Sequence, residues 1–322
     1  MQYKSKNHHY VSQFYLRYFA CNNEETYVNA MTKKGRIIDN PNVISNISSE
    51  KNYNSPLQEV EQSKLESEYA AILKEFLNTP NPDNLHLSND VIEFVCFMYA
   101  NNIDTRKRIS DTLGEMEGQI EGFPVDHITQ LDSSGHRARF DLSTALADAV
   151  FEEISSWKFV CNQTNGYKVF ITGDTPVSIV NPENIQIPVE VNITWTNPRI
   201  TDIGNKSIPI SDKIMRREMK GSITLDNVSF QQDVMMVFPI TPNFCLMGFS
   251  DSGRHKRYKE RSEQTNNNVI SFINLITLGC SNKVVYSHSK KMLKIARKDL
   301  SSFLTYSKTY KRNPSFDIVL LQ

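Results

Sequence analysis

Apolar side chains in the first half of the chain recur mainly at the spacing of amphipathic helices. After Pro56 they return every three or four positions as far as Phe76, and Pro80 and Pro82 end this stripe. A second stripe follows Ser88, a residue type that favours the N-cap position of a helix. The helices that this spacing predicts cover 57–76, 88 to 118 or 122, and 141 or 143 to 157.

Two segments near the N-terminus lack this helical spacing. Residues 26–31 and 35–39 alternate between apolar and polar side chains around a Lys-Lys-Gly turn, so they predict a β-hairpin. The stretch 40–56 is rich in Asn, Ser and Pro, which predicts a loop. The first half is therefore predicted to be helical apart from this hairpin and this loop.

The spacing of the apolar residues changes to two at Trp157. Segments 157–163 and 167–173 both alternate and are joined by Thr-Asn-Gly, and an Asn-Gly pair suits the positive φ angles of a tight turn. We therefore predict a β-hairpin in which these two segments pair with each other. Further strands are predicted at 177–180, 187–195, 234–240, 244–249 and 283–288, and further helices at about 258–278 and 290–305.

Helices in the first half, followed by mostly antiparallel strands, are typical of the α+β class. No internal repeat or long linker divides the chain, so we predict one composite domain over residues 1–322. Within it, residues 1–156 are expected to be mainly helical, and residues 157–322 are expected to form an antiparallel sheet with C-terminal helices. Residues 197–232 are polar and weakly patterned, and we interpret them as an insertion or an excursion.

Composition places the chain among ordinary globular proteins. Hydrophobic residues make up 39% of its 322 residues and charged residues 22%, and its longest apolar runs are shorter than the roughly 20 residues that cross a bilayer. The five cysteines are scattered and form no Cys-x-x-Cys pair, and no secretion signal follows Met1. These features predict a cytoplasmic protein with reduced thiols that does not enter a membrane.

Lysine and arginine are unevenly distributed along this neutral chain. Residues 251–322 hold 14 Lys and Arg against 5 Asp and Glu, whereas the first 250 residues hold 22 against 31. The basic C-terminal region could bind RNA or another polyanion, or it could dock on the acidic part of the same chain. Lys256, Arg257 and Lys259 are the candidate contacts to a nucleic acid in this region.

The chain contains none of the short motifs that mark common cofactor sites and hydrolases. GxxxxGK[ST], GxGxxG, GxSxG and HExxH are all absent. His8 and His9 have no further His or Cys at the spacing of a zinc site, and no cysteine has an obvious paired base. We therefore predict that the protein uses neither a metal nor an organic cofactor.

The opening segment HYVSQFYLRYF combines a histidine, a helix start and an arginine. Ser12 suits the N-cap of a short helix over 13–19, whose aromatic side chains would anchor it in the core. His9 would then be held just before this helix, where an imidazole can exchange protons near neutral pH, and Arg17 could bind an anion. Alternatively, His9 caps a backbone carbonyl and Arg17 pairs with an acid such as Glu66, which belongs to an acidic helix expected to be exposed.

Asp174 lies in a Gly-Asp-Thr-Pro turn at the end of an apolar strand. Gly173 permits unusual backbone angles and Pro176 restricts the residue before it, so the turn would hold a carboxylate at the edge of a sheet. The carboxylate could act on a substrate, or it could simply accept hydrogen bonds from the backbone amides of the turn.

Several segments together resemble the uncharacterised, mainly bacterial family called domain of unknown function 4238. The shared segments are HYVSQFYLRYF from His9, FITGDTPV from Phe170, and VFPITPNFCLMGF from Val237 together with the run from Asn274 to Ser287. Weaker similarity lies at Tyr53, around Glu61 and Glu66, and at Arg106. Ser12 stands where the family usually has proline, which is a mild departure because both residue types start helices. The resemblance covers nearly the whole chain and is weakest over 185–232. It implies no established activity, but some members are found near mobile or phage-defence genes.

These residues together predict a metal-independent phosphodiesterase acting on nucleic acid. We expect an RNase-like effector, because the 2′-hydroxyl of RNA is an internal nucleophile. In this hypothesis His9 is the general acid or base, Asp174 orients it or acts as its partner, and Arg17 together with Arg106 holds the anionic phosphate. The candidate substrate-binding residues are Arg106, Lys256, Arg257, Lys259 and Asn274. The alternative is a non-catalytic sensor or ligand-binding module of a bacterial defence or mobile-element system, as a homo-oligomer or with a partner from the same operon. A thiol hydrolase that uses Cys21 is a third hypothesis.

Overall fold

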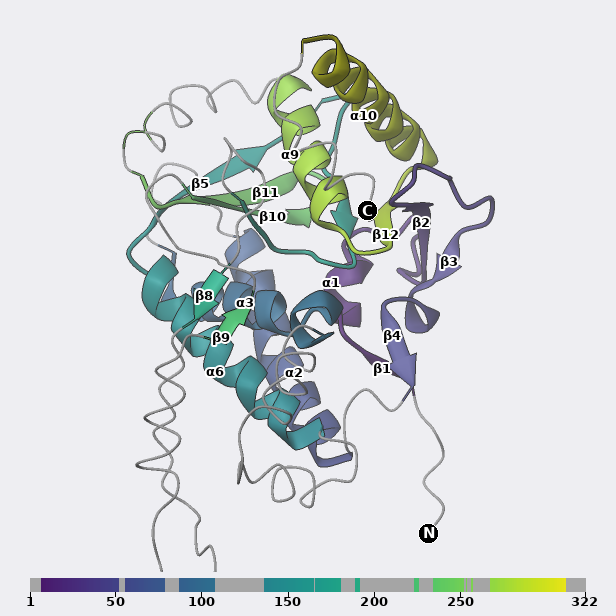
Figure 1. Cartoon of the computed structure of the whole chain (residues 1–322). Coiled ribbons are helices and arrows are strands. Elements are labelled where there is room, and N and C mark those ends of the chain that lie inside the picture. The colour runs from purple at the N-terminus through teal and green to yellow at the C-terminus, as the bar shows by residue number, and fades with distance from the viewer. Residues whose placement is uncertain are drawn as a thin grey trace, which may run out of the picture.

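The helices and strands of the chain form an α+β fold (Figure 1). The computed structural model describes residues 7–51, 56–78, 87–107, 136–164, 166–180, 189–191, 223–225, 234–251, 253, 256 and 267–310. The helices are α1 (Gln13–Arg17), the 3-10 helix η1 (Ile44–Asn46), α2 (Pro56–Asn78), α3 (Asn89–Ala100), α6 (His136–Ile154), α9 (Asn267–Cys280) and α10 (Lys290–Tyr310). The strands are β1 (Asn7–His9), β2 (Tyr27–Thr32), β3 (Asn42–Val43), β4 (Ser49–Lys51), β5 (Lys158–Gln163), β6 (Thr172–Gly173), β7 (Ser178–Val180), β8 (Val189–Val191), β9 (Ile223–Leu225), β10 (Met235–Thr241), β11 (Phe244–Phe249) and β12 (Val284–Ser287).

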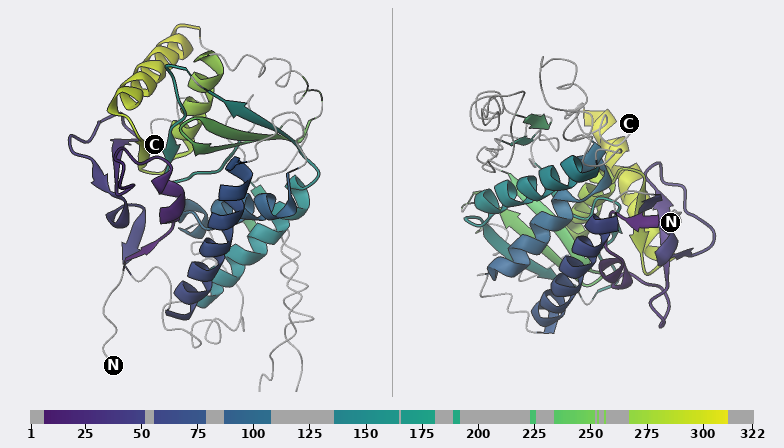
Figure 2. Two further views of the ribbon diagram at one scale, coloured as in Figure 1. Left: turned by 180° about the vertical axis from the view of Figure 1, so that it is seen from behind. Right: turned by 90° about the horizontal axis from the view of Figure 1, so that it is seen from below.

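The largest core is built around a four-stranded antiparallel sheet in the order β5-β11-β10-β7. Helices cover both faces of this sheet, with α2, α3 and α6 on one side and α9 on the other (Figures 1 and 2). Side chains of β10 alternate between the two sides, so that Phe238 packs with the first group of helices and Val237 packs with α9. A strand that is buried on both faces has to be apolar at nearly every position, as β10 and β11 are.

One glycine in β11 is required by the packing of the neighbouring strand. A side chain at Gly248 would place its Cβ atom 2.8 Å from Cε1 of Phe159 in β5. The register of the two strands pairs Gly248 directly with Phe159. The ring of Phe159 therefore occupies the space that any larger residue at position 248 would need.

The second four-stranded sheet, in the order β3-β2-β12-β6, is covered by α10. Met31 of β2 and Val285 of β12 pack against the apolar side of this helix. Among the side chains of α10 that the structure describes, as far as residue 301, the buried ones are Met292, Leu293, Ala296 and Leu300, which recur at helical spacing. Lysine and arginine lie on the other side of the helix, most of them exposed. One helix thus closes the core of this sheet and presents a basic face to solvent.

Tyr15 of α1 joins the two four-stranded sheets. Its side chain is fully buried and stacks on Phe238 of β10, with 5.4 Å between the ring centroids. Its hydroxyl donates to the carbonyl of Pro239 in β10 at 2.5 Å and lies 2.6 Å from the hydroxyl of Thr172 in β6. Proline has no N–H for a sheet ladder, and the register of β10 against β11 shifts between Pro239 and Thr241. Tyr15 therefore bonds to one strand of each sheet, close to this irregularity.

Most of the predicted helices and strands are confirmed, as is the α+β class. The helices predicted after Pro56 and Ser88 are α2 and α3, and the basic C-terminal helix is α10. The helix predicted from Asp141 or Ser143 begins earlier, because α6 starts at His136. The strands predicted at 177–180, 234–240, 244–249 and 283–288 correspond to β7, β10, β11 and β12.

The helix predicted to run from residue 88 past 110 is interrupted. It ends at Ala100, and a separate helical segment covers 103–107. The side-chain amide of Asn101 donates to the carbonyl of Phe97, and that of Asn102 donates to the hydroxyl of Thr105. Asparagine side chains that bond in this way compete with the helical pattern of the backbone, which explains the break. Residues 108–122 lie outside those described.

The predicted hairpin of 157–163 with 167–173 is wrong. β5 pairs with β11, whereas β6 pairs with β12 of the other sheet. The turn itself is present, since the hydroxyl of Thr164 accepts from the N–H of Gly166 and donates to the carbonyl of Lys168. After the turn the chain crosses from one sheet to the other instead of pairing back.

The predicted hairpin of 26–31 with 35–39 is present in its hydrogen bonds, although β2 alone is a regular strand. The N–H of Thr32 donates to the carbonyl of Arg36 at 2.9 Å. Gly35 in the turn has a φ of +83°, in the left-handed region that favours glycine. The Lys-Lys-Gly signal in the sequence therefore identified a true reverse turn.

The remaining predictions are described only in part. The loop predicted over 40–56 is wrong where it contains β3, η1 and β4, since β3 pairs with β2 and β4 pairs with β1. Within the strand predicted over 187–195 the structure describes β8, which pairs with β9 inside 197–232. The helix predicted over 258–278 is described as α9 from Asn267 onwards. Most other residues of 187–266 lie outside those described, so the single composite domain and its insertion stay predictions.

All five cysteines carry free thiols, as the sequence predicted. Burial raises the pKa of Cys96, Cys161 and Cys245, so these residues behave as small apolar side chains. In the part of the chain that the structure describes, the helices are too short or too polar to cross a membrane.

We expect Tyr15→Phe to lower the free energy of unfolding by about 1–3 kcal/mol, because it leaves the carbonyl of Pro239 and the hydroxyl of Thr172 buried without this partner. The ring stays, so the loss reports the hydroxyl alone. Urea denaturation measures it, with Tyr27→Phe as the control, because the Tyr27 side chain is 43% exposed. Equal stability of the two variants would contradict the role of Tyr15 as the joint between the sheets.

Candidate functional site

His9 ends strand β1, and its half-buried imidazole lies between η1 and α1. Its Nε2 is 3.2 Å from the carbonyl oxygen of Ser45, and its Nδ1 is 3.2 Å from the side-chain amide nitrogen of Gln13. A carbonyl oxygen can only accept a hydrogen bond and an amide nitrogen can only donate one, so these contacts place the proton on Nε2. Hydrogen bonds at both ring nitrogens therefore orient His9.

The surroundings of His9 favour the neutral imidazole yet can stabilise the imidazolium. Burial lowers the pKa of His9 below its ordinary value of 6.5, and this is the largest influence. The carbonyl of Ser45 and the charge of Glu59 act in the opposite direction and raise the pKa. At neutral pH the ring is uncharged and able to accept a proton, and an acceptor and a negative charge are close by once it does.

Gln13 and Arg17 continue from His9 along α1 at intervals of four residues. Side chains four positions apart lie on the same face of a helix, and the hydrogen bond from Gln13 joins His9 to this face. Arg17 is exposed and has no ion-pair partner within the described part of the chain. We call these three residues the His9 row, which runs from a half-buried imidazole to an exposed guanidinium.

Glu66 of α2 supports the start of α1 and does not pair with Arg17. Its Oε1 accepts from the hydroxyl of Ser12 at 2.8 Å and from the side-chain amide of Gln62 at 3.2 Å. Gln62 also donates to the carbonyl of His9 at 3.2 Å. Ser12 occupies the predicted N-cap position but makes no side-chain capping bond, because its hydroxyl bonds to Glu66. Helix α2 thus holds the corner between β1 and α1.

The carboxylate of Asp174 is buried and bonds to the turn before β12. Its Oδ1 accepts from the N–H of Asn282 at 2.8 Å, and its Oδ2 accepts from Lys283 at 2.7 Å and Val284 at 3.1 Å. Gly173 permits this approach, since a Cβ atom there would lie 2.0 Å from a serine hydroxyl of the same turn. Asp174 therefore ties the end of β6 to the start of β12.

A polar cluster lies around Asp174. Burial raises the pKa of Asp174 from 3.8 to about 6, although the three backbone N–H groups lower it. Burial also raises the pKa of Tyr10 to about 12, and the charge of Asp174 adds to this shift. The hydroxyl of Ser48 lies 2.9 Å from that of Tyr286, and Ser48 has a φ of +48°, a conformation that costs a non-glycine residue energy. Asp174, Ser48 and Tyr286 of this cluster are buried, and the backbone of Ser48 is strained.

The structure does not bring His9 and Asp174 together. The hydrogen bonds of the Asp174 carboxylate go to residues 282–284, whereas the ring nitrogens of His9 bond to η1 and α1. The charge of Asp174 acts instead on Tyr10, the residue after His9, and raises the pKa of its hydroxyl. Successive side chains of an extended segment point to opposite faces, so the two residues belong to different surroundings. The carbonyl of Ser45 orients His9 in place of Asp174.

The predicted substrate-binding residues are also placed apart. Arg106 is buried, 4% exposed, and its guanidinium donates to the side-chain oxygen of Asn101 in the break after α3. Lys256 is exposed, while Arg257 and Lys259 lie outside the described residues. Neither of the two described residues joins the His9 row.

Asn274 of α9 is used by the backbone of the protein. Its side-chain oxygen accepts from the N–H of Ile171 at 3.0 Å, and its side-chain nitrogen donates to the carbonyl of Val169 at 2.9 Å. The residue is 3% exposed. Its amide thus takes the place of a partner strand for two backbone groups of the segment that leads into β6.

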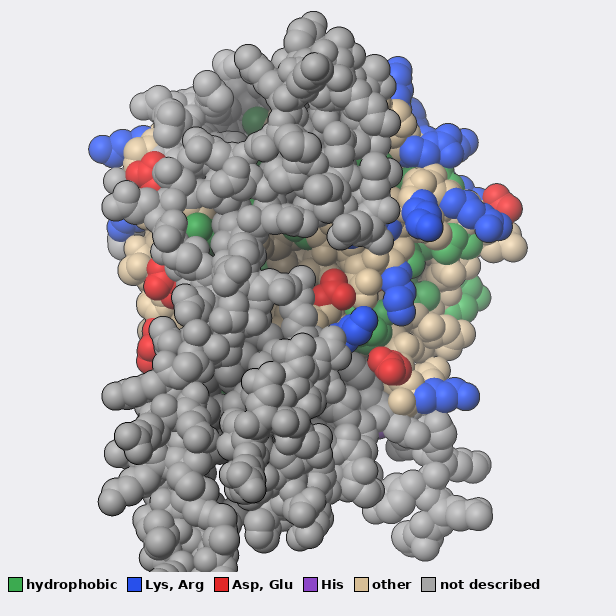
Figure 3. Space-filling view, in the orientation of Figure 1, with side chains coloured by type: hydrophobic (Ala, Val, Ile, Leu, Met, Phe, Trp, Pro, Cys, Tyr) green, Lys and Arg blue, Asp and Glu red, His purple; other side chains and the backbone are tan. Residues whose placement is uncertain are grey.

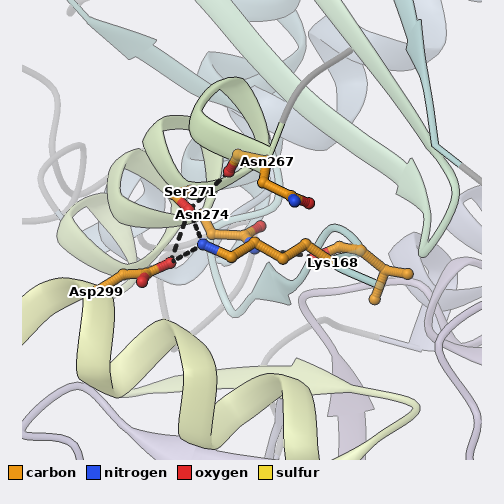
Figure 4. A network of polar contacts seen from close by, with 6 residues as sticks. Lys168, Asn267, Ser271, Asn274 and Asp299 are labelled. Atoms are coloured by element: carbon orange, nitrogen blue, oxygen red, sulfur yellow. Dashed lines mark hydrogen bonds and ion pairs between the residues drawn. The ribbon is translucent and has the colours of Figure 1, made fainter. Parts of the chain in front are cut away.

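A polar network beside Asn274 holds α10 against α9 (Figure 4). Nζ of Lys168 lies 2.9 Å from Oδ2 of Asp299 in α10, and the hydroxyl of Ser271 in α9 donates to the same oxygen at 2.7 Å. A serine next to a lysine can be a nucleophile with its base. Here, however, the lysine donates to the serine hydroxyl, and the serine donates to Asp299, so the lysine does not act as a base on the serine. We interpret this network as a clamp between the two helices.

The surroundings of Cys21 and of the possible metal ligands bear on thiol and metal chemistry. Burial raises the pKa of the Cys21 thiol, which lowers the fraction of thiolate that a nucleophile needs. Within the described ranges, three or more His, Cys, Asp or Glu side chains are nowhere grouped in a way that could hold a metal ion.

The fold and the site together define the class of this protein. It is an α+β protein that carries the His9 row at its first helix. The family model described as "Protein of unknown function (DUF4238)" matches residues 7–194 and 208–291. This match covers most of the chain, and the chain belongs to this family. The matched residues include the His9 row, Asp174 and Asn274.

Among curated proteins, the chain is similar to the AP-2 complex subunit mu of Schizosaccharomyces pombe, with 25% identity over 163 residues. The similarity covers 47% of this chain and 34% of that subunit, so it spans about a third of the relative's length. No solved structure matches the chain at a significant level. At this coverage the similarity assigns no activity to the chain.

Sequence reasoning missed the groups that orient His9 and the charge that raises its pKa. Gln13 had a signal, because it lies four residues from both His9 and Arg17. The carbonyl of Ser45 had none, since every residue has a backbone carbonyl and only the fold selects one. Glu59 had none either, because it comes from a helix that begins 47 residues after His9, at Pro56.

We expect the stability of the protein to report the ionisation of Asp174. Folding raises the pKa of this carboxyl, so the stability that it contributes is complete below about pH 4 and is lost as the pH rises through about 6. Wild type should therefore lose free energy of unfolding relative to Asp174→Asn between these values. Urea denaturation at each pH measures the difference.

The control for this charge change is Asp39→Asn, at an exposed position. Asp174→Asn should also be less stable than wild type by about 1–3 kcal/mol at low pH, because an amide nitrogen cannot accept from a backbone N–H. A stability difference between wild type and Asp174→Asn that stays constant with pH would contradict the raised pKa.

We expect Asn274→Asp to lower the free energy of unfolding by about 1–3 kcal/mol or more, because a carboxylate cannot donate to the carbonyl of Val169 and would be buried. Asn267→Asp is the matched control on the same helix, since Asn267 is exposed. Thermal melting of both variants makes the comparison. If the two variants melt alike, the amide of Asn274 does not replace a partner strand.

Proposed function

We propose that the protein is a metal-independent phosphodiesterase that cleaves RNA, with His9 as the general base and Arg17 as the phosphate-binding residue. The observation that carries this proposal is the His9 row, in which a neutral, oriented imidazole is bonded to Gln13 and an exposed guanidinium follows Gln13 one turn further along α1. A base just before a short helix and a cation at the end of that helix are the two groups that phosphodiester cleavage by an internal nucleophile needs.

The reaction begins with attack of the ribose 2′-oxygen on the adjacent phosphorus. His9 takes the 2′-hydroxyl proton on Nδ1 as the bond between the 2′-oxygen and phosphorus forms. The bond from phosphorus to the 5′-oxygen breaks, and the leaving 5′-oxygen takes a proton from solvent. The products are a 2′,3′-cyclic phosphate and a 5′-hydroxyl. Substrate has to displace Gln13 from Nδ1 for this step, and Nε2 keeps its bond to Ser45 throughout.

The protein groups around this step supply charge where it develops. The carbonyl of Ser45 and the charge of Glu59 stabilise the imidazolium that forms on His9. The guanidinium of Arg17 can bind two oxygens of the phosphate as negative charge builds on them. Gln13, once released from His9, can donate its amide to the same phosphate. Gln13 orients His9 before substrate binds and contacts the phosphate afterwards, and no metal ion is needed for either task.

Asp174, Arg106 and Asn274 are not part of this site. Their polar groups bond to the protein itself, in the turn before β12, in the break after α3 and in the segment before β6. The catalytic unit proposed from the structure is therefore smaller than the one proposed from the sequence. It keeps His9 and Arg17 and adds Gln13.

The proposed setting of the activity is the bacterial cytoplasm. An RNase-like effector of this kind suits a role in phage defence, where degradation of RNA halts the production of virus. Membership of the DUF4238 family is compatible with this setting and does not assign it.

The second candidate function is a ligand-binding module without chemistry. It is favoured by one observation, namely that both ring nitrogens of His9 are already occupied by hydrogen bonds within the protein. In that case an anion binds to Arg17 and Gln13, and His9 only holds Gln13 in place. Binding of RNA without any cleavage would support this function.

The test is cleavage of single-stranded RNA by the purified protein in the presence of a chelator. We expect a 2′,3′-cyclic phosphate product and no cleavage of DNA of the same sequence, because DNA lacks the nucleophile. His9→Ala should slow the reaction roughly a hundredfold or more, the usual contribution of a general base. It should cost about 1 kcal/mol of stability for each hydrogen bond lost.

The pH profile distinguishes a base from a structural histidine. A base has to be unprotonated, so kcat/KM should fall as the pH drops through the pKa of His9, which lies below 6.5. Lys158→Ala, on the exposed edge of β5, is the control for Arg17→Ala, and it should cleave like wild type. Wild-type protein that leaves RNA intact at every pH would overturn the proposed function.

A further inference from the structure

The exposed face of α10 is strongly basic. Its apolar side is buried in the core under β2 and β12, which fixes the direction of the other side. Lys291, Lys294 and Lys298 are exposed there, at intervals of three and four residues that place them in one row. Asp299, the acidic residue of this part of the helix, pairs with Lys168 and so is not available to neutralise the row.

The turn between residues 32 and 36 extends this basic surface on one side of the helix. A Cβ atom at Gly35 would lie 3.4 Å from Cδ of Arg297, so the turn lies against α10. Lys34 and Arg36 of the turn are exposed. Lysine and arginine side chains gather over α10 and the β2–β3 region in the space-filling view (Figure 3). Segments far apart in the sequence therefore form one cationic surface.

An exposed aromatic ring borders the row at Lys291. The side chain of Tyr167 is 62% exposed, and Nζ of Lys291 lies 4.2 Å from the centre of its ring. The tyrosine follows the turn at Gly166 and precedes Lys168, whose ion pair with Asp299 fixes this segment to α10. A large aromatic ring is thus held in solvent beside a row of lysines by a clamp in the protein.

We propose that this surface binds single-stranded nucleic acid, with its phosphates along Lys291, Lys294 and Lys298 and a base stacked on Tyr167. Aromatic rings next to cationic grooves are the usual means of holding single strands without sequence preference, because every base has a face that can stack. A duplex hides those faces, so it binds less tightly. The apolar side of α10 is buried as far as Leu300, so the part of the helix whose side chains the structure describes has no free apolar face to insert into a membrane.

The inference has two parts. That the surface binds a single strand is independent of the proposed function. That the bound strand is also the substrate of His9 rests on the proposed function and deepens it. A DNA strand separates the two, because it offers phosphates and bases but no 2′-hydroxyl for the proposed reaction.

The experiment is fluorescence anisotropy of a short labelled oligodeoxythymidylate titrated with the full-length protein. We expect binding that weakens steeply with salt, because bound counterions are released from the phosphates. The combined variant Lys34→Glu, Lys294→Glu and Lys298→Glu should bind about tenfold more weakly or worse. Tyr167→Ala should bind roughly fivefold more weakly or worse, whereas Tyr167→Phe keeps the ring and should bind like wild type.

The matched control is the combined variant Lys64→Glu, Lys74→Glu and Lys158→Glu, which makes the same change of net charge at exposed lysines of α2 and β5. It should bind within about twofold of wild type, apart from the general effect of net charge. Circular dichroism and thermal melting show whether each variant is folded. Vesicles that contain anionic phospholipid serve as a second probe.

Each outcome decides between the proposals. If both triple variants weaken binding equally, or if the protein binds the vesicles but not the strand, the inference about α10 is overturned. If the strand binds as expected while RNA stays intact, the inference stands and the proposed function fails. If RNA is cleaved in a manner that depends on His9 while the α10 variants bind the strand like wild type, the proposed function stands and the inference fails.

Discussion

Burial of the β10–β11 hairpin on both faces is the constraint on which the rest of the structure depends. Strands without a polar face cannot lie at a surface, so helices have to cover both sides of their sheet. α2, α3 and α6 cover one side and α9 covers the other. The position of α9 in turn places Asn274 and Ser271, which hold the segment before β6 and, through Asp299, helix α10. The basic face of α10 is thus a distant consequence of apolar packing.

The same packing determines how the candidate catalytic histidine is presented. Tyr15 is locked between the two sheets by its ring and its hydroxyl, which fixes the rotation of the short helix α1. The face of α1 that carries Gln13 and Arg17 then points away from the core. The imidazole of His9 is half-buried, and this burial lowers its pKa and favours the neutral form. The carbonyl of Ser45 and the charge of Glu59 can stabilise the protonated form. The buried ring of Tyr15 and the imidazole of His9 are therefore both positioned by the short helix α1.

Several polar residues that resemble site residues serve the backbone instead. Asp174 accepts hydrogen bonds from three N–H groups of a turn, and Asn274 bonds to two backbone groups of the segment that leads into β6. A buried backbone group without a partner costs about as much as several surface interactions contribute, so a fold with irregular crossings needs such side chains. Residues of this kind and residues of an active site have the same signature in a sequence, namely a polar side chain in an apolar setting. The hydrogen-bond partners distinguish them.

The sequence by itself determined the α+β class, the family, and those helices and strands whose apolar spacing is complete within one segment, such as α2, α3, β10, β11 and α10. It also singled out His9 and Arg17. The tertiary structure alone decided that 157–163 and 167–173 belong to different sheets, that part of 40–56 forms strands, and that Ser45 rather than Asp174 orients His9. The physical reason is the same in each case. Local spacing encodes which face of an element is apolar, whereas the partner of a strand, a ring nitrogen or a carboxylate is a backbone group that any residue can offer, and only the packed fold brings one within reach.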